Sequence, residues 1–137
     1  MIRKALIILL LGLILSACGS NTADVLVGTW KLVSYGESAN LTHPVLGVDT
    51  SVSFNEDGSV NGNVGCNSFG GKYKVSGEKI IFKEVFSTEM ACDEPLMEQE
   101  SFVLTLFEGE TTFIYEESNG TLVILSVDEK RAIALQK

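Results

Sequence analysis

Short runs of alternating apolar and polar residues dominate the chain after residue 27. Residues 28–35 alternate and predict a first strand. The segments 51–64, 71–84 and 111–126 each hold two such runs around a glycine-containing turn, which is the pattern of a β-hairpin. Residues 127–136 return with a last strand. The pattern therefore predicts about eight short strands, and their close spacing favours a meandering antiparallel barrel or sandwich.

One segment, residues 93–109, lacks this alternation and has the spacing of a helix. Asp93 is placed to cap its start, and Gly109 is placed to end it. Its apolar side chains fall on one helical face: Leu96, Met97, Val103, Leu104 and Phe107. We therefore expect a mainly β fold, a small antiparallel barrel-like domain of about eight strands. One α-helix is inserted after the fifth strand and covers an open end or seam.

The N-terminal segment has the pattern of a secretory signal peptide. Arg3 and Lys4 precede an apolar run over residues 5–15, which is too short to span a membrane comfortably. The run ends in Leu-Ser-Ala-Cys, residues 15–18, which resembles the bacterial lipobox, whose cysteine is acylated and becomes the first mature residue. We expect a signal peptide over residues 1–17, a lipidated tether over 18–26 and a domain over 27–137.

The expected lipid anchor indicates where in the cell the domain lies. The resemblance implies several acyl chains on Cys18, enough for stable attachment to a membrane. We expect the domain in the cell envelope, facing the periplasm or the exterior. Gly19 does not match the aspartate that retains many lipoproteins at the inner membrane, so we expect the outer membrane in a host that has one.

The chain carries a net negative charge. Its formal net charge is −8, and removal of Arg3 and Lys4 with the signal peptide lowers it to −10. Nucleic-acid binding needs a basic footprint, so this charge disfavours nucleic acid and we expect none as a partner. The charge instead favours solubility, and we expect a monomer.

Two cysteines, Cys66 and Cys92, remain after lipidation of Cys18. They do not form a Cys-x-x-Cys motif, and with the distant His43 they make a poor zinc site. An exported domain most simply pairs them in a disulfide. Closing a loop of that length stabilises a fold by about 3.5 kcal/mol in the chain-entropy model. The alternatives are two buried free thiols, or a catalytic or metal-binding role.

Several segments together resemble a known family. They occur in the order GTWKL, FNEDGSVNGNVGCNSFGGKY, STEMAC, MEQESFVLTL and GTLVIL, and they cover residues 27–136. In this order they resemble the META-domain family, the HslJ-like heat-shock lipoproteins. The resemblance implies a small β-barrel-like domain with one helix, an envelope location, and a link to stress response and antibiotic tolerance. It implies no defined molecular activity and no catalytic residues.

Four residues are candidates for binding or for a structural role. Trp30 follows Gly28 with the spacing also seen in lipocalins, and either plugs the barrel end or contacts a ligand. Asn67 and Phe69 lie in the glycine-rich turn, where Phe69 is expected to be core rather than a contact residue. Glu100 interrupts the apolar face of the helix, so we expect it to be buried and hydrogen-bonded to the backbone rather than to bind a ligand.

No catalytic constellation is evident in the sequence. His43 lies beside Pro44 in the loosest stretch, and no nucleophile elbow or phosphate-binding loop is present. We expect a non-enzymatic protein without cofactor or metal. The sequence favours a lipid-anchored envelope protein that contacts an unidentified envelope protein in envelope maintenance or stress tolerance. The alternative is a lipocalin-like binder of a small apolar ligand.

Overall fold

The computed structural model describes residues 22–137, so the predicted signal peptide and Cys18 lie outside the described residues. Along the chain these residues form α1 (Thr22–Leu26), β1 (Gly28–Glu37), β2 (Asn40–Thr42), β3 (Ser51–Phe54), β4 (Ser59–Asn63), β5 (Ser68–Ser76), β6 (Lys79–Ser87), α2 (Glu94–Leu106), β7 (Glu110–Glu116), β8 (Thr121–Ser126) and β9 (Arg131–Gln136).

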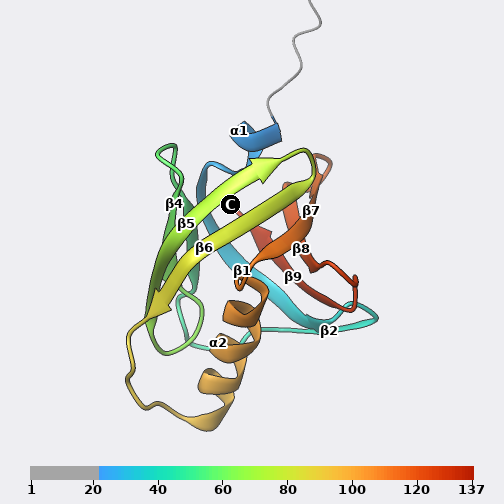
Figure 1. Cartoon of the computed structure of the whole chain (residues 1–137). Coiled ribbons are helices and arrows are strands. Elements are labelled where there is room, and N and C mark those ends of the chain that lie inside the picture. The colour runs from blue at the N-terminus through green and yellow to red at the C-terminus, as the bar shows by residue number, and fades with distance from the viewer. Residues whose placement is uncertain (1–21) are drawn as a thin grey trace, which may run out of the picture.

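The strands form an antiparallel barrel (Figure 1). Neighbours from β3 to β9 pair in chain order, β1 pairs with β3, and β1 also pairs with β9 to close the sheet. Closure makes eight strands of the barrel, and β2 adds to β1 as a ninth. The predicted fold class, a small antiparallel barrel with one inserted helix, is confirmed.

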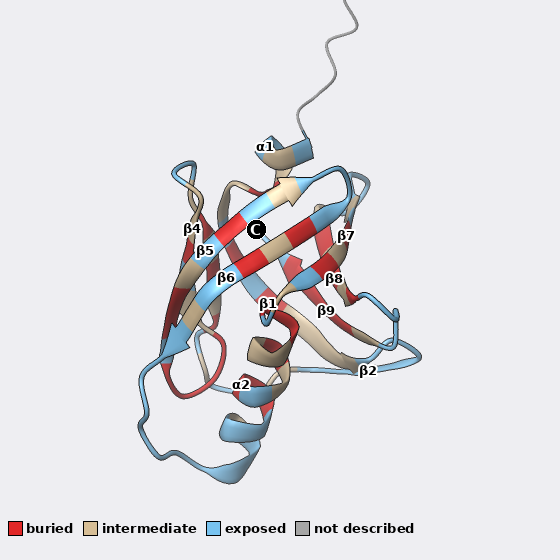
Figure 2. Cartoon of the chain, in the orientation of Figure 1, coloured by how far each residue is buried: buried red, intermediate tan, exposed pale blue. Residues whose placement is uncertain are grey.

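The barrel interior is filled by side chains. Alternation places every second residue of a strand inside, as in β3, where Val52 and Phe54 are buried and the two serines are half-buried. Figure 2 shows buried positions alternating with half-buried and exposed ones along the strands. The largest fully buried side chains come from elements all around the barrel, among them Trp30, Phe54, Ile80, Phe107, Leu122 and Ile133.

The helix α2 follows the sixth strand rather than the fifth. The additional strand is β2, which pairs with the end of β1, with Tyr35 opposite Thr42. All three of its residues are exposed, so it has no apolar alternation that would reveal it in the sequence. Figure 1 places α2 at the end of the barrel opposite to α1.

The buried face of α2 differs from the predicted stripe. Gln99, Glu100, Val103 and Leu106 are buried, whereas Met97 is 43% exposed. The inward polar groups have backbone partners, because Gln99 Nε2 donates to the Val64 carbonyl at 2.7 Å and Oε1 accepts from the Val45 N–H at 2.7 Å. Satisfied hydrogen bonds allow polar groups on a buried face.

Folded structure begins earlier than residue 27. Residues 22–26, expected as the end of a tether, form the short helix α1, and Leu26 is completely buried. The Thr22 hydroxyl donates to the Gly77 carbonyl at 3.2 Å, which ties α1 to the turn between β5 and β6. Within the described part of the chain, neither helix combines the length and apolar character needed to cross a membrane.

Candidate functional site

The glycine-rich turn between β4 and β5 is joined covalently to the segment before α2. Cys66 and Cys92 form a disulfide with a Cα–Cα distance of 6.0 Å and a sequence separation of 26. That distance is within the usual range for such a bond. The predicted pairing is confirmed, and with both sulfurs bonded to each other neither is a free thiol.

Asn67 holds the same two segments together through hydrogen bonds. Its Oδ1 accepts from the Met90 N–H at 2.6 Å and from the Thr88 hydroxyl at 3.0 Å. Its Nδ2 donates to Glu100 Oε1 at 2.8 Å and to the Met90 carbonyl at 3.3 Å. Both donor and both acceptor positions of the amide are therefore used, and Asn67 is only 5% exposed. These contacts give Asn67 a structural role.

Glu100 reaches from α2 to the backbone of the turn. Its Oε2 accepts from the Asn67 main-chain N–H, and Oε1 accepts from the Asn67 side chain. Glu100 is 8% exposed, so the carboxylate exchanges most of its water for these donors. The residue thus lies as the sequence led us to expect, buried and bonded to a backbone group.

Gly65 allows α2 to approach the turn this closely. A Cβ at this position would lie 2.6 Å from the Glu100 Cβ and 2.7 Å from the Leu96 carbonyl oxygen. Both distances are shorter than any side-chain contact allows, so only glycine fits without moving the helix. The turn, the disulfide and α2 therefore form one rigid unit, which we call the stapled turn: residues 64–67 with Met90, Cys92 and Glu100.

Phe69 belongs to the core beneath the stapled turn. Its side chain is 4% exposed, and its ring centroid lies 5.5 Å from that of Phe107. Phe107 in turn stacks on Phe82 at 4.5 Å, so the three aromatic rings form a continuous packed row. Phe69 accordingly packs inside and does not reach a partner.

Trp30 plugs the barrel at the α1 end. The side chain is completely buried, and its Nε1 donates to the Leu26 carbonyl at 2.7 Å. The Tyr115 ring meets it edge-on with the ring centroids 6.2 Å apart, and Lys137 Nζ lies over the Trp30 ring, 4.6 Å from its centroid. This packing closes the α1 end of the barrel and makes Trp30 a core residue.

Three large apolar side chains are exposed around the stapled turn. Phe86 is 68% exposed, Met90 59% and Met97 43%. The Phe86 ring lies over Gly70, where an added Cβ would come within 2.8 Å of it. Met90 has its main chain fixed by Asn67, and Met97 lines a groove with Cys92. We call these three side chains the apolar rim.

Sequence reasoning did not single out the apolar rim. Phe86 and Met90 lie at and beyond the end of a strand, where alternation no longer says which side is buried. Met97 was assigned to the buried face of the helix. The one available signal was Gly70-Gly71, since paired glycines in a strand indicate that another group approaches closely.

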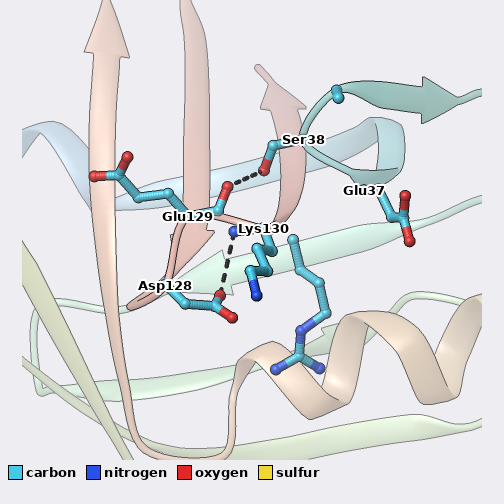
Figure 3. Close-up of a pocket in the computed structure, with 7 residues that line it drawn as sticks. Glu37, Ser38, Asp128, Glu129 and Lys130 are labelled. Carbon is cyan, nitrogen blue, oxygen red and sulfur yellow. Dashed lines mark hydrogen bonds between the residues drawn. The ribbon is translucent and has the colours of Figure 1, made fainter.

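A second pocket lies between the β1–β2 and β8–β9 turns (Figure 3). The Ser38 hydroxyl donates to the Glu129 carbonyl at 2.6 Å. The Asp128 carboxylate accepts from the Ser126 hydroxyl at 2.6 Å and from the Lys130 N–H at 3.2 Å, and these bonds lower the pKa of Asp128. The polar groups of this pocket therefore have structural partners: the Ser38 bond joins the two turns, and the Asp128 bonds fix the β8–β9 turn.

Comparison with known proteins identifies the family. An NMR structure of a protein from Burkholderia xenovorans matches with a TM-score of 0.68 and 18% identity, over 83% of this chain and 84% of that one. A second NMR structure matches with a TM-score of 0.62 and 19% identity, over 81% of this chain and 90% of that one. At these identities the two matches show a shared fold. No curated protein sequence matches the chain. The META domain matches residues 23–137, nearly the whole described barrel, and the chain therefore belongs to the META domain family.

Proposed function

We propose that this META-domain protein is an HslJ-like lipoprotein of the cell envelope that works without catalysis, by contact with another envelope protein. The proposal for the anchor rests on the Leu-Ser-Ala-Cys motif at residues 15–18 and the signal-peptide pattern before it. Its biological role would be envelope maintenance or tolerance of stress. In a host with two membranes, Gly19 favours attachment to the outer membrane.

The apolar rim is the observation that carries the proposed protein contact. Exposed aromatic and methionine side chains are typical of protein interfaces, where a few of them supply most of the binding energy. Each projects from an ordered backbone: Phe86 from β6, Met97 from α2, and Met90 from a main chain that Asn67 binds. A rigid support lowers the conformational entropy lost on binding, so side chains of this kind bind a partner more tightly.

The packing of the barrel supports contact at the surface rather than ligand storage. Trp30, Phe54 and Phe107 are each exposed by 1% or less, and they lie in the interior that a carrier would leave open. A protein partner that binds the outer surface needs no such cavity. The exposed rim beside the stapled turn then becomes the part of the described surface to test first.

Crosslinking in living cells tests the proposal. A photoreactive amino acid would replace Met90, and in a matched strain Val127, which is similarly exposed at 62% but lies in the β8–β9 turn. We expect mass spectrometry to find a discrete envelope protein joined at position 90 and not at 127. Equal capture at both positions, or capture of no protein at position 90, would contradict a contact through the rim.

A further inference from the structure

The end of the barrel that carries α1 has its own exposed apolar groove. Val25 of α1 and Phe113, Ile114 and Tyr115 of β7 line it, and Ile114 is 56% exposed. Three carboxylates from separate elements surround these side chains: Asp24 from α1, Glu78 from the β5–β6 turn and Glu117 from the β7–β8 turn. We call this surface the α1 groove.

The length of chain between the proposed anchor and α1 limits where this groove can be. Cys18 and Thr22 are four residues apart, and a fully extended chain covers at most about 14 Å over that distance. The polar headgroup layer on each side of a bilayer is about 5–8 Å thick. If Cys18 carries the acyl chains, Thr22 cannot rise far above the headgroups, and Thr22 itself lines the α1 groove.

We propose that the α1 groove rests on the lipid surface, with Ile114 and Val25 against the headgroup layer and the carboxylates beside headgroup ammonium groups. The charge favours this occupant, because Asp24, Glu78 and Glu117 complement a zwitterionic lipid with a free amine and repel an anionic one. The inference rests on the proposed lipid anchor. It also sets an orientation: α2 and the stapled turn, at the opposite end of the barrel in Figure 1, face away from the membrane.

Lipid-borne quenching measures this orientation directly. The mature lipidated chain would be placed in vesicles of phosphatidylethanolamine and phosphatidylcholine with a nitroxide on a fraction of the headgroups. A fluorophore would be attached in turn to Ile114→Cys, Glu117→Cys and Val127→Cys. Glu117 and Val127 lie in exposed turns at the two ends of β8, so those variants keep the core intact. We expect quenching several-fold stronger at positions 114 and 117 than at 127.

The outcomes separate the orientation from the anchor. A chain that does not float with the vesicles has no working anchor, and that result overturns both proposals. A chain that floats but is quenched equally at positions 117 and 127 keeps the anchor and overturns the orientation. Replacing phosphatidylethanolamine by phosphatidylglycerol should weaken the quenching at 114 and 117, and unchanged quenching there would overturn the assignment of amine headgroups.

Discussion

Glu100 and Asn67 form the contact on which the stapled turn depends. A carboxylate on a buried helix face is costly unless donors replace its water, and here both donors come from one residue of the turn. Each residue satisfies the other, because the Asn67 main-chain N–H would be buried without a partner if Glu100 were absent. Neither residue is free to bind a ligand while the fold is intact.

Removing the carboxylate should therefore destabilise the fold. We expect Glu100→Ala to lower the free energy of unfolding by about 2–4 kcal/mol, because it leaves two buried donors of Asn67 unpaired. Glu100→Gln keeps one acceptor and should cost less. Glu98→Ala, on the exposed side of the same helix, is the control and should change stability by less than about 0.5 kcal/mol. Urea unfolding of the three variants makes the comparison, and equal losses for Glu98→Ala and Glu100→Ala would argue against the buried contact.

Substitution of Phe69 tests whether its side chain belongs to the core below the turn. We expect Phe69→Ala to cost about 3–5 kcal/mol, since it removes a buried ring that packs on Phe107. Phe86→Ala removes a ring of the same size that is 68% exposed, and its midpoint of thermal unfolding should stay within a few degrees of the parent. An unchanged midpoint for Phe69→Ala would overturn its assignment to the core.

At the scale of elements, the strands could be predicted from the sequence, but the way the helices pack could not. Alternation in segments such as 51–54 reports directly which residues face inward. The helix α2 also has a clear period, yet its rotation depends on Gln99 and Glu100 reaching the backbone of Val64 and Asn67. Contacts between residues so distant in sequence leave no local pattern.

The same limit applies to the candidate site. Cys66, Asn67, Phe69 and Glu100 stand out because their residue types are unusual for their positions. What could not be read from the sequence is that Asn67 binds the Met90 main chain, and that this contact and the disulfide join the same two segments. The strand β2 was missed for a different reason, since its three residues are all exposed.

The disulfide links the turn to the segment before α2, and we predict that it forms in the exported protein. Alkylation of the unreduced, denatured mature protein should leave both Cys66 and Cys92 unlabelled. Replacing both by serine should lower the free energy of unfolding by about 3.5 kcal/mol in the chain-entropy model, less any residual order in the unfolded chain. Full labelling of both peptides without reductant would show that the pairing does not form in the exported protein.

The whole molecule has two distinct ends. Helix α1 lies at one end of the barrel and α2 at the other (Figures 1 and 2). The α1 groove and Trp30, which bonds to Leu26, belong to the α1 end. The stapled turn belongs to the α2 end, because Glu100 of α2 bonds to Asn67. The proposed lipid anchor at Cys18 would attach the molecule by the first end. In that orientation the second end would face the proposed protein partner.

The anchor itself is tested by metabolic labelling with a fatty-acid probe. The native chain should incorporate the probe, and Cys18→Ser should not, because the acylated position is lost. Comparing the membrane fractions of the two strains adds a second readout, in which the variant should leave the membrane fraction or accumulate as a longer precursor. Equal labelling of both chains would remove the basis for the lipidated N-terminus.

The central claim is that the side chains of the apolar rim make a protein contact, while the stapled turn supports the Met90 side chain by holding its main chain. One variant tests this claim most directly. Phe86 and Met90 would both be replaced by alanine, with a photoreactive residue at the exposed Glu89 between them. We predict a thermal midpoint within a few degrees of the parent and loss of the crosslinked envelope partner in living cells. An unchanged yield of the same crosslinked partner from this folded variant would contradict the account.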